Sequence, residues 1–180
     1  LYERTASIPE FQRTRDLIYV LARVAFLNKD VLARPGADSV LMLGDVDLLD
    51  QELKQFFTIG VGRPNYEAVV EHDVRLAKER SPREYALAVG LYIYSLIAGD
   101  VRKSAADRKT LRTLVARPRD VDPQVIDAAL DNLLGYSWYV DTDGERFWIS
   151  AEPNINKVLQ EEAGLVDRVE ALRQVESELE

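Results

Sequence analysis

Residues 107–150 carry the pattern that most constrains what this chain can fold into. Apolar residues recur at helical spacing over 107–116 and again over 122–134, which predicts two short helices, the second ending at Gly135. Asp143-Gly144 follows, a dipeptide typical of tight hairpin turns, between two runs of aromatic and β-branched residues. Two short helices and then a hairpin are the order of a winged-helix module, whose second helix would enter a DNA groove.

The hairpin turn also predicts which residues pair across the two strands. A hairpin centred on Asp143-Gly144 places aromatic or β-branched residues opposite each other on both faces. Cross-strand pairs of these types stabilise a sheet. The predicted pairs are Val140–Phe147 and Trp138–Ile149 on one face and Tyr139–Trp148 on the other.

The charge of the second helix conflicts with a role in DNA binding. Over 122–134 the helix has no lysine or arginine and three aspartates, Asp122, Asp127 and Asp131. The whole chain carries a net charge of −8. Because binding to phosphate backbones is driven by basic residues that release counterions, both observations favour a winged helix that packs against protein over one that reads bases.

The DNA-binding alternative stays open through a few candidate contacts. Gln124 and Asn132, on the exposed side of the second helix, are residue types that recognise adenine. Arg108, Lys109 and Arg112 on the preceding helix supply positive charge for contact with phosphates. These residues are the predicted nucleic-acid contacts if the alternative holds.

The rest of the chain predicts a mainly α fold. Helical spacing of apolar residues predicts further helices over 7–28, 50–57, 65–77 and 83–98. A short apolar run at 40–43 is either a buried strand or an extended connector. Ser81-Pro82 has the order of an N-cap and a first helical residue, and Pro82 is the predicted boundary between two parts. These parts are a helical bundle over 1–80 and a winged-helix subdomain over 81–160.

The first predicted helix is so apolar that we expect protein to cover it on more than one side. Ser7 and Glu10 match a capping box at its start. Residues at three- and four-residue spacing form the predicted buried face. They are Leu17, Leu21, Val24 and Ala25, with Ile18 and Val20 beside them.

Both ends of the sequence are typical of a fragment cut from a longer protein. The first residue is Leu1 rather than methionine. The last apolar residues keep helical spacing up to Glu180. They are Leu165, Val169, Leu172, Val175 and Leu179. We therefore expect an amphipathic helix over 161–180 that continues beyond the fragment.

Several classes of active site are excluded by residue type alone. The chain has no cysteine and one histidine, His72, which leaves no thiolate chemistry, no histidine-rich metal site and no Ser-His-Asp triad with a spare imidazole. Gly60-Val61-Gly62 lacks the spacing and the lysine of a phosphate loop. We predict no catalytic residue and no metal ligand. The sequence also lacks an apolar run of roughly 18 residues and a signal peptide, which fits a cytoplasmic location.

Short stretches of the sequence match one known family in the same order. They are Leu1–Thr5, Phe11–Arg15, Gly44–Leu48, Phe147–Ile149 and Glu152–Asn156. The chain resembles a large prokaryotic family of AAA+-type ATPases, long proteins whose genes often lie beside DNA methyltransferase or phage-defence genes.

The resemblance implies a piece that lies C-terminal to a P-loop ATPase core, with a helical lid-like part followed by the winged helix. ATP and Mg would then bind in the parent protein, and the fragment alone would not be an enzyme. Arg13 or Arg15 would sense the nucleotide phosphate, since an arginine on the lid helices often has this role in AAA+ proteins. The implied function is a non-catalytic regulatory or coupling module. Its partner would be the ATPase core of the same polypeptide, with DNA or DNA-modification proteins as further partners.

Overall fold

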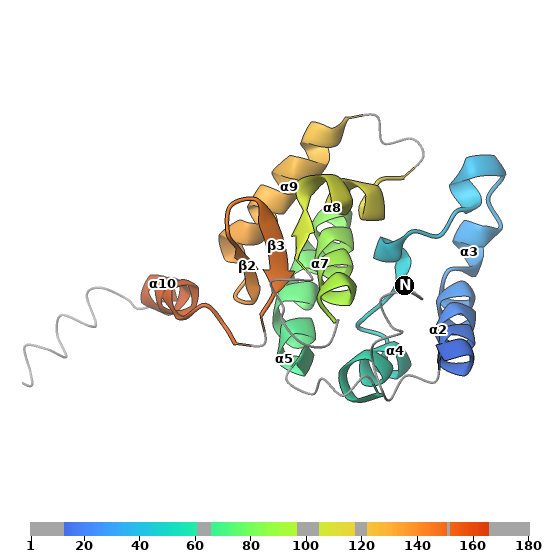
Figure 1. The fold of residues 1–180 in the computed structure, drawn as a ribbon, viewed down its shortest axis with the longest axis horizontal. Coiled ribbons are helices and arrows are strands. Elements are labelled where there is room, and N and C mark those ends of the chain that lie inside the picture. Colours follow the sequence, from blue (N-terminus) through green and yellow to red (C-terminus); the bar gives the residue numbers. More distant parts are fainter. Residues whose placement is uncertain (1–12, 61–65, 97–104, 118–121, 151, 166–180) are drawn as a thin grey trace, which may run out of the picture.

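A computed structural model describes residues 13–60, 66–96, 105–117, 122–150 and 152–165. As predicted, the fold is mainly helical, and it includes one small antiparallel sheet of three strands (Figure 1). The predicted capping box of Ser7 and Glu10 and the apolar residues after Leu165 lie outside the described residues.

The first half of the described chain is a series of short helical elements. They are α2 (Arg13–Leu27), α3 (Lys29–Leu32), the 3-10 turns η1 (Gly36–Ser39) and η2 (Leu43–Asp45), α4 (Gln51–Gln55), the π-helical η3 (Phe56–Gly60), α5 (Glu67–Val69), the π-helical η5 (Val70–Val74) and α6 (Arg75–Arg80). The apolar run at 40–43 leads into η2 with extended backbone and joins no sheet, so it is a connector.

Helix α7 (Pro82–Ser95) lies at the centre of the described structure. As predicted, Pro82 lies in the first turn and the Ser81 hydroxyl accepts the N–H of Arg83. Leu87 and Leu91 are fully buried, and the helix packs against α6, α8, α9, η2 and the sheet. Residues on both sides of Pro82 therefore contribute to one hydrophobic core.

The second half contains the predicted pair of helices and the predicted hairpin. Its elements are β1 (Ala106–Asp107), α8 (Arg108–Val115), α9 (Pro123–Tyr136), β2 (Val140–Thr142) and β3 (Arg146–Ile149), and the sheet order is β1-β3-β2. Gly135 does not end α9, because the helix continues to Tyr136 and Gly135 lacks the positive φ of a glycine cap.

The hairpin turns one residue later than predicted. Gly144 has a φ of 97°, and no non-glycine residue described has a positive φ, so Gly144 and Glu145 form the centre of the turn. The Asp143 carboxylate accepts the N–H of Arg146 at 2.8 Å and holds this turn. All three predicted pairs are therefore wrong. The observed pairs are Val140–Ile149, Asp141–Trp148 and Thr142–Phe147. Because the shift is two residues, each side chain keeps its predicted face.

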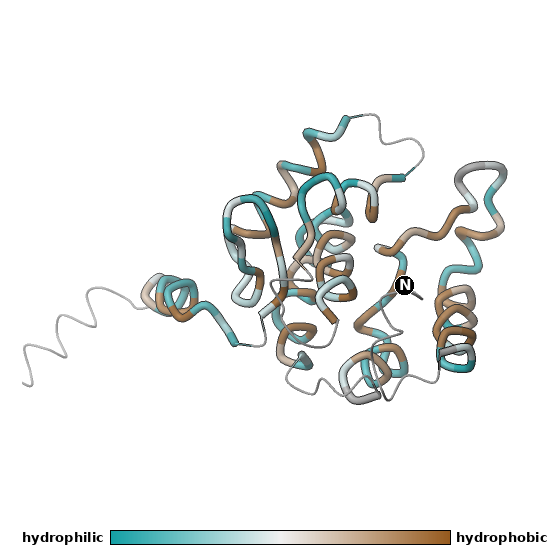
Figure 2. The backbone as a smooth tube through the Cα atoms, viewed as in Figure 1, coloured by the Kyte–Doolittle hydropathy of each residue, from teal (hydrophilic) through white to brown (hydrophobic). Residues whose placement is uncertain are grey.

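Helix α2 is covered on one side only in the described structure. Val20 and Val24 are buried, whereas Ile18 is 61% exposed and Leu21 is 56% exposed. The prediction that Leu21 is buried is therefore wrong, and within the described residues only the side of α2 with Val20 and Val24 is covered. An Arg23–Asp50 ion pair of 2.7 Å holds α2 to the rest of the molecule. Figure 2 shows α2 as a largely hydrophobic tube at one edge of the molecule.

Helix α10 (Ile155–Leu165) lies at the opposite end of the longest axis from α2 (Figure 1). Two side-chain hydrogen bonds attach it to the hairpin region. The Lys157 ammonium donates to the carbonyl of Val140 at 3.1 Å, and the Trp138 indole N–H donates to Glu161 at 2.6 Å. These bonds fix which side of α10 faces the rest of the molecule.

Candidate functional site

The surface formed by α8 and α9 holds most of the predicted nucleic-acid contacts. Each helix begins with an aspartate whose side chain accepts an early N–H: Asp107 from Thr110 at 2.7 Å, and Asp122 from Gln124 at 2.8 Å. Apolar residues on the inner faces, such as Leu111 and Leu130, are buried in the core. The outer faces, which carry the predicted contacts, therefore have a fixed position relative to each other.

Two of the predicted phosphate contacts are occupied by aspartates of α9. The Arg108 guanidinium donates to Asp131 at 2.7 Å. Arg112 forms a two-bond fork with Asp127, in which Nε donates to Oδ1 at 2.9 Å and Nη2 donates to Oδ2. The guanidinium of Arg112 holds the pKa of Asp127 below its ordinary value, and the pKa of Arg112 is raised in turn. Both arginines of α8 are thus paired with aspartates of α9, and Lys109 is the third cation of the helix.

The other three predicted nucleic-acid contacts differ in whether their side chains already bind another part of the protein. Lys109 and Gln124 are exposed. The Asn132 amide points toward α7 and donates to the buried carboxylate of Glu84 at 3.4 Å. The same carboxylate accepts a hydrogen bond from the hydroxyl of Tyr136 at 3.0 Å. A base-reading role for Asn132 would therefore compete with a contact between α7 and α9.

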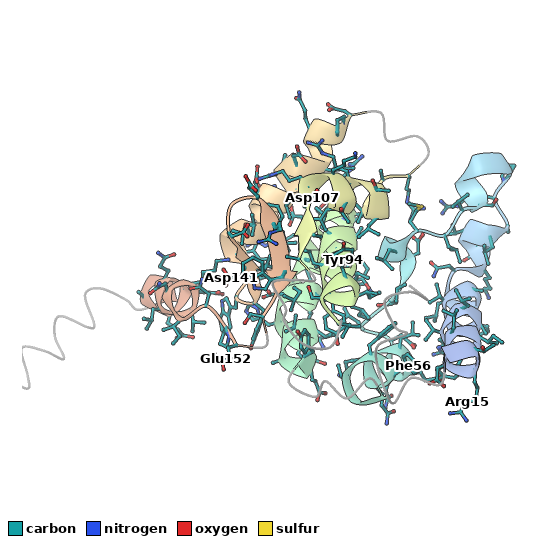
Figure 3. All side chains as sticks on the ribbon, in the orientation of Figure 1. Arg15, Phe56, Tyr94, Asp107, Asp141 and Glu152 are labelled. Carbon is teal, nitrogen blue, oxygen red and sulfur yellow. The ribbon has the colours of Figure 1, made fainter. Side chains whose placement is uncertain are left out.

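The predicted phosphate sensors are not part of this surface. The side chain of Arg13 lies outside the described residues. Arg15 lies in the first turn of α2, where its side chain is 74% exposed and Nε donates to Asp16 at 3.3 Å. Figure 3 shows Arg15 far from Asp107, which begins α8. The structure therefore does not bring the candidate phosphate sensor and the candidate nucleic-acid contacts together.

A cleft of about 450 Å³ lies between η2, α7 and the ends of α8 and α2. Four of the five charged residues that line it form two ion pairs: Arg117 with Asp45, and Lys78 with Asp47 at 3.0 Å. None of the predicted site residues lines the cleft. A ligand here would have to compete with both ion pairs.

The sequence does not single out Asp73, the most deeply buried carboxylate of the described chain. It is fully buried and accepts the backbone N–H groups of Trp138 and Tyr139, each at 2.9 Å. His72 lies 2.8 Å from the same carboxylate and stacks on Trp138 with ring centroids 3.8 Å apart. Asp73 joins η5 to the start of the hairpin, and its partners are more than 60 residues away in the sequence. No local signal identifies it.

Comparison with protein-family models, with curated protein sequences and with solved structures gave no match. Within the part of the chain that the structure describes, no three His, Cys, Asp or Glu side chains gather in a way that could hold a metal ion. Among the same residues, none of the helices has the length and apolar character needed to cross a membrane.

Proposed function

We propose that this chain is a non-catalytic coupling module of a P-loop ATPase of the AAA+ type, with a winged helix that contacts protein rather than DNA. The order α7-β1-α8-α9-β2-β3, with β3 in the middle of the sheet, supports a winged-helix assignment. In this assignment α9 is the helix that would enter a DNA groove. The ATPase part of the proposal comes from the family resemblance.

The ion pairs between α8 and α9 are the observation that favours protein over DNA as the partner of this surface. Phosphate binding requires basic side chains that are available to replace counterions. Arg108 and Arg112 each already bind an aspartate of α9, so a phosphate would have to displace Asp131 and Asp127 from them. The displaced carboxylates would then lie beside the DNA backbone and repel it. This surface is therefore better suited to contact with protein.

Removing these aspartates provides a direct test by gain of function. We expect the wild-type chain to show no binding to duplex DNA at about 50 mM salt in a fluorescence anisotropy titration. The double variant Asp127→Asn/Asp131→Asn releases Arg108 and Arg112. Its affinity should be at least about tenfold higher than that of the wild type, and should fall steeply with salt.

A matched variant controls for net charge. Asp30→Asn/Glu162→Gln removes the same number of negative charges from exposed positions on α3 and α10, and should leave DNA binding unchanged. Salt-sensitive micromolar binding by the wild type would reject the proposed role and favour the DNA-binding alternative. If Asp127→Asn/Asp131→Asn also fails to bind, the surface does not have the geometry of a DNA reader, and the winged-helix assignment loses its support.

The ATPase part has its own test. The polypeptide that contains this sequence should have a Gly-x-x-x-x-Gly-Lys-Ser/Thr phosphate loop N-terminal to Leu1. In that protein, Arg13→Ala or Arg15→Ala should lower the rate of ATP hydrolysis if one of them senses the phosphate. Arg34→Ala, at an exposed arginine after α3, is the matched control. Unchanged rates in both test variants would remove the sensing role, and absence of the loop would remove the ATPase assignment.

A further inference from the structure

Helix α10 contributes no described residue to the hydrophobic core of the molecule. Ile155 and Leu159 are 69% and 60% exposed, and within the described part of the helix only Lys157 and Val158 are even partly buried. Figure 1 shows α10 on the outer side of β2, apart from the other helices. Burial of apolar surface, the main force that holds helices in a fold, therefore holds α10 only weakly.

Within the described residues, two side-chain hydrogen bonds attach α10 to the rest of the molecule. The Glu161 carboxylate accepts the indole N–H of Trp138 in an exposed bond, and the Lys157 ammonium donates to the carbonyl of Val140 in a partly buried one. Docking also removes part of the hydration of the Lys157 ammonium, and this burial lowers its pKa. Because water replaces such bonds when they break, each bond contributes only modestly to holding α10 in place.

The surface that receives α10 is, by contrast, held firmly. Both bonds end at the start of the hairpin, where the backbone N–H groups of Trp138 and Tyr139 donate to the buried carboxylate of Asp73. The ring of Trp138 also stacks on His72. The backbone N–H of Asn154, the residue before α10, donates to the Trp138 carbonyl at 2.7 Å and fixes the start of the helix to the same place. Helix α10 can therefore swing about its first residue while its docking surface stays unchanged.

We propose that α10 is a detachable arm, which exchanges between the docked position of Figure 1 and a released position by turning about Asn154. The bonds of Glu161 and Lys157 to the start of the hairpin form the latch. Release breaks these bonds and leaves the core intact, because α10 adds no described residue to it. The released state is therefore populated within the folded protein, and a partner that binds one of the two states shifts the exchange toward it.

Distance measurements between two spin labels test the exchange, and the absence of cysteine from the sequence allows the labels to be placed at chosen sites. Gln160→Cys on α10 and Lys109→Cys on α8 both lie at exposed positions. In double electron–electron resonance the docked position should give a narrow distance population and the released position a broad one. Glu161→Ala and Lys157→Met each remove one bond of the latch and should raise the ratio of released to docked protein about fivefold.

A matched variant and a stability measurement identify the latch as the cause. Glu162→Ala makes the same change at the exposed neighbour of Glu161 and should leave both distance populations unchanged. The midpoint of thermal unfolding should be the same in all these variants, because the core loses nothing.

Three results would overturn the proposal. The first is a single distance population, narrow or broad, that neither latch variant alters. The second is an equal effect of Glu161→Ala and Glu162→Ala. The third is a lower unfolding midpoint in Glu161→Ala and Lys157→Met, because α10 would then be a fixed part of the fold. The outcome does not depend on the ATPase assignment.

Discussion

The centre of the molecule around α7 and the outer helix α2 use the same residue types in opposite ways. Around α7, leucines such as Leu133 are fully buried, and the buried carboxylates of Asp73 and Glu84 accept hydrogen bonds. On α2, Ile18 and Leu21 face away from the protein. The difference teaches that helical spacing identifies an apolar face without identifying the surface that covers it.

The α8–α9 surface follows the pattern of the centre. Arg108 and Arg112 bind carboxylates of the same chain, so both arginines are paired before any partner binds. The outer helices α2 and α10 leave apolar side chains without a cover in the described structure.

The largest expected loss of stability follows a substitution of the buried Asp73, near α7. Asp73→Ala should lower the free energy of unfolding by about 3 to 5 kcal/mol, because the N–H groups of Trp138 and Tyr139 lose their buried acceptor. Urea denaturation followed by circular dichroism measures this change. Glu71→Ala is the matched control: Glu71 is a partly exposed carboxylate that binds Lys54, and its loss should cost less than about 1 kcal/mol. Equal losses in both variants would contradict the assigned role of Asp73.

One substitution made in both regions tests the comparison directly. Leu133→Ala should destabilise the protein by about 2 to 5 kcal/mol, because it leaves a cavity in the core. Leu21→Ala should change stability by no more than about 0.5 kcal/mol in dilute solution, because the side chain is already exposed to water. Urea denaturation at low protein concentration measures both. A large loss for Leu21→Ala would show that the outer face of α2 is covered within one copy.

The elements that depend on local sequence were predictable. Ser81-Pro82 and Asp122-Pro123 mark helix starts by their own chemistry, and the helices at 83–98 and 122–134 begin as predicted. The hairpin was predicted from Asp143-Gly144, but its register depends on which central position holds the glycine. Gly144 in the first position moves the pairing by two residues.

The features used to argue the proposed function, and the buried carboxylate of Asp73, depend on contacts between residues distant in sequence. The binding of Arg112 to Asp127 requires the packing of α8 on α9, and the sequence shows these residues only as members of separate charge groups. The buried Asp73 meets its partners across more than 60 residues. Leu21 is exposed because few elements pack on α2. The helical spacing of apolar residues carries no information about which elements pack on a helix.

Gly44 lies where η2 contacts α7, and a substitution there should cost less stability than those of Asp73 and Leu133. A Cβ at Gly44 would lie 2.4 Å from the Cβ of Ala86, so Gly44→Ala should destabilise the protein by about 1 to 3 kcal/mol. Gly135 provides a control of opposite sign. It lies inside α9 with no atom within 4 Å of an added Cβ, so Gly135→Ala should stabilise the protein by up to about 1 kcal/mol. Thermal denaturation measures both, and a neutral Gly44→Ala would show that η2 moves freely from α7.

The smallest expected effect concerns the ion pair that attaches α2 to the centre. Hydrogen bonding to Arg23 and to the N–H of Leu53 holds the pKa of Asp50 below its ordinary value of 3.8. A carboxyl whose pKa is lowered by folding contributes stability above its ordinary pKa, and this contribution is lost as pH falls through the lower pKa of the folded state. Asp50→Asn removes the charge but keeps a residue able to cap α4. The wild type should therefore be more stable than Asp50→Asn at pH 7, and urea denaturation should show the difference shrinking below about pH 4. A difference that is the same at pH 7 and pH 3 would mean that the side-chain charge of Asp50 does not hold α2 in place.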